Sequence, residues 1–208
     1  MSIGAGVKVK VCGITNLEDA LAAFFCGADA IGFIFYKKSP RYIDPLKARR
    51  ISLILPKKII RTGVFVDEKE GKVKSIARMC NLDMLQFHGK ESPEFCSKFK
   101  GYKIIKAFRV KDKLELSELK RYKVFAYLFD TFSKDQAGGT GKKFNWNLLP
   151  GKGKIKRSVF LSGGLSIKNV RSALKQVKPE WVDLSSAVEE KPGKKNHRKM
   201  RSFIRLVK

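Results

Sequence analysis

The chain has 208 residues, 43% of them hydrophobic and 31% charged, which is enough for one buried core and predicts a single domain over residues 1–208. Its four cysteines form no CxxC pair, so we expect no zinc framework. No segment reaches the ~20 apolar residues of a membrane span, so we expect no membrane contact and predict a cytoplasmic protein. With 45 Lys and Arg against 19 Asp and Glu, the net charge is +26, which is typical of proteins that bind nucleic acid or anionic substrates.

Strand-like apolar runs alternate with helical patterns along the chain. In the first run Val and Lys alternate with the period of two of a β-strand, and the run ends at Cys12. A helix opens at Asn16, and the next helix begins with Asp44 as N-cap and Pro45 as first helical residue. The predicted strands are 7–12, 30–35, 59–66, 84–88, 103–108, 124–129, 158–162 and 181–184. The predicted helices are 16–26, 44–55, 70–79, one from about 92, a short weak one at 114–119, 167–177 and 195–207.

Eight strand–helix units of about 25 residues each fit one architecture best, a single (β/α)8 TIM barrel with a shortened fifth helix. A flavodoxin-like or Rossmann sheet would usually need only five or six units. No Gly-x-Gly-x-x-Gly sequence follows the first strand, which argues against a dinucleotide-binding fold.

Candidate functional residues fall where these strands end, and in a barrel all eight ends share one face. They are Cys12 after the first strand, Arg41 after the second, His88 at the end of the fourth, Asp130 after the sixth, and Asp183, Ser185 and Ser186 at the eighth. Asp67 and Arg109 belong to the same face, but ion pairs with neighbours would explain them equally well.

Cys12 and Asp130 form a candidate base and acid on opposite sides of the barrel mouth. Cys12 is equally well explained as a small packed residue, because free cysteine is often buried. As a base it must be a thiolate, which requires nearby positive charge or helix N–H groups. Asp130 directly follows an apolar run, where a carboxylic acid can serve as general acid; the alternative is a helix cap or loop-ordering role.

Arg41 and His88 are candidate substrate contacts. The two-pronged guanidinium of Arg41 suits a planar carboxylate, although an arginine in a loop is more often a solvated surface residue. His88 is either a donor facing the ligand or an imidazole that braces its loop.

Two glycine-rich segments predict a phosphate site and therefore a small phosphorylated substrate. Glycine lets backbone N–H groups approach an anion closely, and barrel phosphate sites are commonly built from the loops after the seventh and eighth strands. The alternative for each segment is a tight turn. The predicted phosphate contacts are Gly139, Thr140, Gly141, Gly163, Gly164, Ser185 and Ser186.

With these residues the chain resembles the phosphoribosylanthranilate isomerases, (β/α)8 enzymes of tryptophan biosynthesis, over nearly its whole length. The motifs that carry the resemblance are 10–15 (KVCGIT), 32–35 (GFIF) with 39–41 (SPR), 63–66 (GVFV), 85–89 (LQFHG), 130–131 (DT), 138–141 (GGTG) with Phe144 and Trp146, 161–165 (LSGGL), 183–186 (DLSS) and 192–194 (PGK).

The resemblance implies an Amadori rearrangement of N-(5-phosphoribosyl)anthranilate. Asp130 would then be the general acid that opens the sugar ring, and Cys12 the general base that takes the proton from C2 of the sugar. Arg41 would hold the anthranilate carboxylate with His88 nearby, and Asp183 would contact sugar hydroxyls. No metal or organic cofactor is implied, and members of the family occur as monomers or homodimers.

Three positions depart from the family pattern. Asn145 and Asn196 stand where the family usually has aspartate, and Ala187 stands where it usually has glycine. Asparagine caps helices as well as aspartate does, whereas alanine would be strained if position 187 needs a positive φ.

Two other interpretations stay open. One is a histidine-pathway isomerase on the same barrel, which the thiol at position 12 argues against because that enzyme type uses two aspartates. The other is a basic nucleic-acid-binding protein on an inactive barrel. Its support is the net charge alone, and because the lysines are spread along the chain without an RNA-binding motif, we do not expect nucleic acid as a partner.

Overall fold

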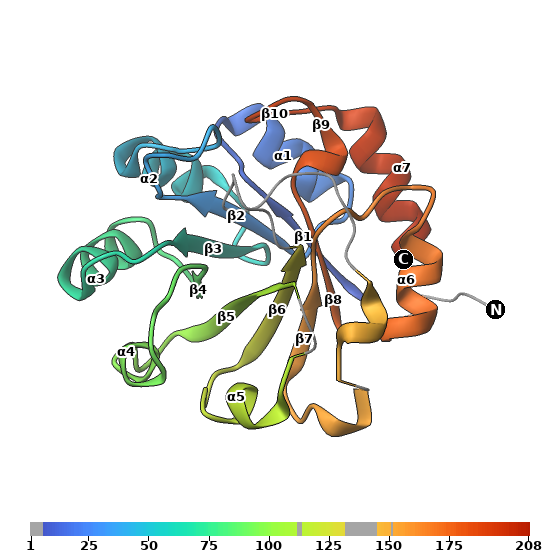
Figure 1. Cartoon of the computed structure of the whole chain (residues 1–208). Coiled ribbons are helices and arrows are strands. Elements are labelled where there is room, and N and C mark those ends of the chain that lie inside the picture. Colours follow the sequence, from blue (N-terminus) through green and yellow to red (C-terminus); the bar gives the residue numbers. More distant parts are fainter. Residues whose placement is uncertain (1–5, 112–113, 132–144, 151) are drawn as a thin grey trace.

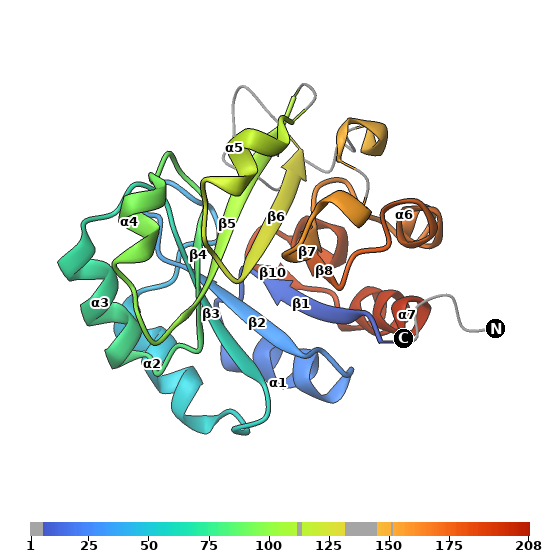
Figure 2. The same cartoon turned by 90° about the horizontal axis from the view of Figure 1, so that it is seen from below.

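Eight parallel strands close into a barrel in the order β1 to β8. The computed structural model describes residues 6–111, 114–131, 145–150 and 152–208. Helices α1–α7 surround the strands in two perpendicular views (Figure 1 and Figure 2). The strands are β1 (Lys8–Cys12), β2 (Ala30–Ile34), β3 (Ile60–Phe65), β4 (Met84–Phe87), β5 (Lys103–Val110), β6 (Ala126–Thr131), β7 (Ser158–Leu161) and β8 (Trp181–Leu184). The predicted TIM barrel is therefore confirmed.

The helices are α1 (Leu17–Phe25), α2 (Pro45–Ile54), α3 (Glu70–Met79), α4 (Pro93–Ser97), α5 (Leu116–Lys120), α6 (Val170–Val177) and α7 (His197–Val207). The fifth helix is short, as predicted, and α4 is equally short. Three 3₁₀ turns, η1 (Trp146–Leu148), η2 (Lys152–Lys154) and η3 (Ser186–Val188), complete the described helical segments. The sequence did not indicate the antiparallel ribbon of β9 (Glu189–Lys191) and β10 (Lys194–Lys195).

Side-chain caps fix several helix starts. Asn16 accepts from the Asp19 amide at 2.8 Å, and Asp44 accepts from the Leu46 amide at 2.8 Å. The last helix was predicted from 195 but begins at His197, because the Asn196 side chain caps it. The helix predicted from 167 likewise begins later, at Val170.

The lysine of β1 points into the barrel, and the valines on either side of it point outward toward the helices. Val9 and Val11 of β1 pack into the core between strands and helices, whereas Lys10 points into the barrel and is fully buried. An inner apolar cluster fills the lower barrel, where the rings of Phe160 and Trp181 stack with centroids 4.7 Å apart. Lys10 pairs in register with Asp183, two residues beyond Trp181, so a polar layer lies above this cluster, toward the C-terminal strand ends.

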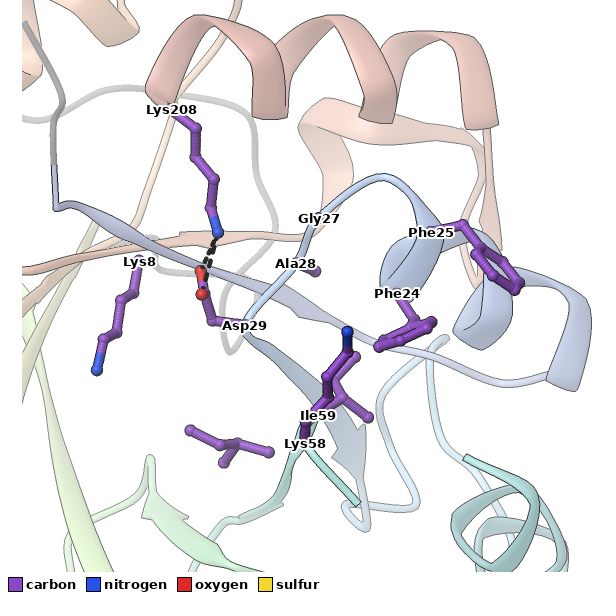
Figure 3. Close-up of a pocket in the computed structure, with 10 residues that line it drawn as sticks. Lys8, Phe24, Phe25, Gly27, Ala28, Asp29, Lys58, Ile59 and Lys208 are labelled. Carbon is purple, nitrogen blue, oxygen red and sulfur yellow. Dashed lines mark hydrogen bonds and ion pairs between the residues drawn. The ribbon is translucent and has the colours of Figure 1, made fainter. Parts of the chain in front are cut away.

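A pocket also lies at the opposite, N-terminal end of the strands (Figure 3). Lys58 sits over the ring of Phe24, 4.9 Å from its centroid, and Lys208 pairs with Asp29 at 2.9 Å. Since barrel chemistry is carried by the C-terminal face, we assign this end to stability. No helix of the described residues is long and apolar enough to cross a membrane.

Candidate active site

The structure brings the predicted site residues to one end of the barrel. Cys12 is the last residue of β1, His88 directly follows β4, and Asp130 and Asp183 lie near the ends of β6 and β8. Asp130 was predicted just after its strand but lies within β6, and Arg109, predicted beyond its strand, lies within β5. One pocket is lined by Asp130, Ser162–Leu165 and Asp183–Ala187. The predicted contacts Gly139, Thr140 and Gly141 lie outside the described residues.

Cys12 is buried beside a glycine that makes room for its sulfur. Gly32 is its register partner on β2, and a Cβ on Gly32 would lie 2.7 Å from Cys12 Sγ. Burial raises the pKa of the Cys12 thiol, and although the ammonium groups of Lys10 and Lys195 act in the opposite direction, the pKa stays above its ordinary value. The thiol is therefore the favoured form of Cys12 at neutral pH.

The two carboxylate oxygens of Asp130 have different surroundings. Oδ1 accepts from the amide of Thr131 at 2.8 Å, and Oδ2 lies 3.3 Å from His88 Nε2. Gly163 packs against this pair so closely that a Cβ there would meet the Thr131 nitrogen at 2.5 Å and Asp130 Oδ1 at 2.8 Å. Oδ2 is thus the oxygen that stays available for proton transfer.

Lys10 and Asp183 form an ion pair inside the barrel, with Lys10 Nζ 2.8 Å from Asp183 Oδ1. Nζ also donates to Gln86 Oε1 at 2.8 Å. Burial opposes the charge of Lys10, but the charges and hydrogen bonds of Asp183 and Cys12 outweigh it and raise the pKa of the ammonium group. A permanent cation therefore lies two residues from Cys12 on the inner face of β1.

Arg41 is buried and already engaged. Its Nε and Nη2 donate to the two carboxylate oxygens of Glu189, at 2.9 and 2.7 Å, which leaves Nη1 without a partner in the described part of the chain. Lys195 Nζ contacts Glu189 Oε1 at 2.9 Å and donates to the Cys12 carbonyl at 2.6 Å. The cluster holds two cations and one carboxylate, so it presents excess positive charge next to Cys12, which favours an anionic ligand.

The loop after β7 can receive a phosphate. Gly163 and Gly164 have φ values of +77° and +63°, which glycine adopts readily, and their amides donate to no acceptor in the described segments. The buried Ser185 Oγ likewise has no hydrogen-bond partner there. Ala187 does not adopt a positive φ, so its replacement of glycine causes no backbone strain.

Asp67 and Arg109 brace the rim. Asp67 Oδ1 accepts from the Lys90 amide at 2.6 Å, and Arg109 Nη2 donates to the His88 carbonyl at 3.3 Å.

Asn145, which stands where the family usually has aspartate, accepts from the Asn147 amide and caps η1 as an aspartate would. Described Cys, His, Asp and Glu side chains form no group of three placed to hold a metal ion.

Sequence reasoning missed four buried polar residues of the site: Lys10, Gln86, Glu189 and Lys195. For the first two a signal existed, since Lys10 precedes Cys12 by two residues and Gln86 precedes His88 by two, which puts each pair on one face of a strand. For Glu189 and Lys195 no local signal exists, because their site contacts lie 148 and 183 residues away along the chain.

Comparison with known proteins agrees with this geometry. A family model described as N-(5′-phosphoribosyl)anthranilate (PRA) isomerase matches residues 9–206. The N-(5′-phosphoribosyl)anthranilate isomerase of Pelobacter propionicus is 46% identical over 202 residues, covering 97% of this chain and 96% of that protein. The crystal structure of the phosphoribosyl anthranilate isomerase of Thermotoga maritima has a TM-score of 0.90 at 45% identity and covers 97% of this chain and 98% of its own.

A second solved structure, with a TM-score of 0.83 at 42% identity and the same coverage of both chains, is a phosphoribosyl anthranilate isomerase in complex with reduced 1-(o-carboxyphenylamino)-1-deoxyribulose 5-phosphate. The resemblance drawn from the strand-end motifs is confirmed, and the chain belongs to the N-(5′-phosphoribosyl)anthranilate isomerase family.

Proposed function

We propose that Cys12 and Asp130 of this chain carry out the reaction of its family, the conversion of N-(5′-phosphoribosyl)anthranilate to 1-(2-carboxyphenylamino)-1-deoxyribulose 5-phosphate in tryptophan biosynthesis. The observation that supports these roles is their placement. The thiol of Cys12 ends β1 and the carboxylic acid of Asp130 lies one residue before the end of β6 in one closed barrel, and both side chains are buried at the same rim.

Asp130 acts first, as general acid. It gives a proton from Oδ2 to the ring oxygen of the sugar, while the nitrogen of the substrate supplies the electron pair that opens the ring to an iminium. The hydrogen bond from the Thr131 amide keeps Oδ1 occupied and holds the carboxyl group in place. The transfer needs no cofactor, because the electron pair comes from the substrate.

Cys12 acts second, as general base. Its thiolate removes the proton from C2 of the opened sugar, and the C–H electron pair forms the double bond of an enolamine. The enolamine then gains a proton at C1 and loses the hydroxyl proton at C2, which gives the ketone. The buried ammonium groups of Lys10 and Lys195 favour the thiolate during this step.

The phosphate and the carboxylate of the substrate determine its orientation in the site. Its phosphate binds the amides of Gly163 and Gly164, which donate to no acceptor among the described residues, together with Ser185, Ser186 and the Gly139–Gly141 segment. Its carboxylate binds the remaining Nη1 donors of Arg41, since Glu189 occupies the other edge of the guanidinium. Asp183 faces the sugar hydroxyls, and His88 lies beside Asp130, with its Nε2 3.3 Å from Oδ2.

The test is direct. Purified protein should convert 5-phosphoribosylanthranilate, followed by the loss of substrate fluorescence in a coupled assay. Absence of turnover by correctly folded protein would refute the proposed function. We expect the protein to work in the cytoplasm. We also expect it to be a monomer or a homodimer, because every proposed site residue comes from a single chain, and sedimentation analysis determines which.

A further inference from the structure

A continuous line of side chains crosses the barrel from the Cys12 side to the Asp130 side. Lys10 Nζ lies 2.8 Å from Gln86 Oε1, and Gln86 Nε2 lies 3.0 Å from His88 Nδ1. His88 Nε2 in turn lies 3.3 Å from Asp130 Oδ2. Gln86 occupies the middle of this line, and both it and Lys10 are buried in the barrel.

The ammonium group of Lys10 sets the direction of every contact in the line. A lysine ammonium can only donate, so the atom of Gln86 that faces it is the amide oxygen. The amide nitrogen therefore faces His88 Nδ1 and donates to it. A ring nitrogen that accepts carries no proton, and the tautomer of a histidine is set by the partner of its other nitrogen.

The proton of His88 consequently belongs on Nε2. This atom is buried and makes no hydrogen bond of good geometry with the described residues, although Asp130 Oδ2 lies within 3.3 Å. Because the Thr131 amide holds Asp130 Oδ1, the oxygen that lies 3.3 Å from Nε2, Oδ2, is the carboxylate oxygen of Asp130 that is free to react.

We infer that Gln86 is a positioning residue: held by Lys10, it fixes the His88 ring with its proton on Nε2, the ring nitrogen that lies next to Asp130 Oδ2. Once Asp130 has given up its own proton, Oδ2 accepts from His88 and the new carboxylate is stabilised. The tautomer follows from the contacts alone, whereas its effect on rate rests on the proposed function.

The chain is well suited to a direct test, because His88 and His197 are its only histidines. His197 contacts Asp19 through its Nε2 at 2.8 Å, is not part of the line, and serves as internal reference. With ¹⁵N-labelled histidine, NMR distinguishes a protonated ring nitrogen from an unprotonated one. We expect wild-type His88 to show protonated Nε2 and unprotonated Nδ1.

Gln86→Glu keeps the shape of the side chain but replaces the donor that faces Nδ1 with a carboxylate oxygen. We expect the His88 proton to move to Nδ1, the His197 signals to stay unchanged, and kcat to fall roughly tenfold or more, as happens when a catalytic histidine is held in the wrong tautomer. Thr62→Val is the matched control, an isosteric change of a buried inward residue with no hydrogen-bond partner in the described chain. It should alter neither the spectrum nor kcat.

A wild-type spectrum with the His88 proton on Nδ1 overturns the inference. This test does not depend on whether the Gln86→Glu protein folds. A folded Gln86→Glu protein with unchanged tautomer and unchanged kcat overturns it as well. If the wild-type spectrum shows protonated Nε2 but the protein does not turn over phosphoribosylanthranilate, the tautomer assignment stands and the proposed function fails.

Discussion

At the level of single residues, the proposed role of Cys12 depends on the charge state of its thiol. The proposed step needs a thiolate, but burial raises the pKa of the thiol despite the Lys10 and Lys195 ammonium groups. The reactive form of the free protein is therefore a minor species at neutral pH. The same two lysines partly offset the cost of a buried thiolate, because their positive charges lower the pKa of Cys12.

The pH dependence of kcat/KM follows from this balance. Since kcat/KM reports the ionisations of the free protein, it should rise as pH increases toward the pKa of Cys12, about tenfold per pH unit where the thiol predominates. The rise should continue past about pH 8.5, the ordinary thiol value. A plateau already reached between about pH 6 and 8 would show that the thiolate predominates in the free protein and would contradict this account.

Asp130→Asn should remove the general acid without changing the shape of the site. We expect kcat to fall by about 10²- to 10⁴-fold with little change in KM, because the lost proton transfer occurs only in the transition state. Asp67→Asn is the matched control on the same rim, since asparagine tolerates the positive φ of 49° and still accepts from the Lys90 amide. Equal kcat values for the two variants would exclude Asp130 as the acid.

At the level of elements, the ribbon of β9 and β10 connects distant parts of the site. Glu189 starts the ribbon and binds Arg41 of the β2–α2 loop, while Lys195 ends it and binds the Cys12 carbonyl. Burial tends to raise the pKa of Glu189, but the hydrogen bonds and charges of Arg41 and Lys195 hold it below its ordinary value. The stability contributed by this carboxylate is therefore present above its unfolded-state pKa and is lost as pH falls through the folded value.

Glu189→Ala should destabilise the protein by about 3–5 kcal/mol, because it leaves two buried cations without a counter-charge. Urea unfolding measures the change. Glu190→Ala is the matched control: its partner Lys194 lies 3.0 Å away, but both side chains are more than half exposed, and such solvated pairs contribute little to stability. A loss below about 1 kcal/mol for Glu189→Ala would show that the cluster is not structural.

At the level of the whole molecule, the barrel could be predicted because each strand–helix unit carries a local signal. The alternation of patterns, the Asp44–Pro45 helix start and the weak fifth helix are all readable from neighbouring residues. Once a barrel is predicted, the rule that strand ends share one face is enough to place Cys12 and Asp130 together.

The polar contacts inside the site could not be predicted from the sequence, because they form only once the barrel is closed. The alternation of Val and Lys in β1 is equally typical of a solvent-facing strand, and only closure turns Lys10 inward onto Gln86 and Asp183. The engagement of Arg41 by Glu189 spans 148 residues and depends on a ribbon with no strong pattern of its own. A predicted substrate contact thus proved to be partly occupied by the protein itself.

The net charge of +26 is also a property of the whole molecule. If it reflects lysine on solvated faces, any affinity for duplex DNA should be sequence-independent and should fall by about 10³–10⁵ between 50 and 200 mM salt, as counterion release predicts for six to ten phosphate contacts. Fluorescence anisotropy at the two salt concentrations measures this. Tight binding that persists at 200 mM salt would instead support a dedicated nucleic-acid partner.

The central claim is that Cys12 takes the proton from C2 of the substrate, and Cys12→Ser tests it most directly. The hydroxyl is nearly isosteric but a far poorer base, so turnover of phosphoribosylanthranilate should fall by about 10²-fold or more. Reduced 1-(o-carboxyphenylamino)-1-deoxyribulose 5-phosphate should still bind with wild-type affinity, since Cys12 holds neither the phosphate nor the carboxylate. A Cys12→Ser protein that turns over substrate within a few fold of the wild-type rate would contradict the account.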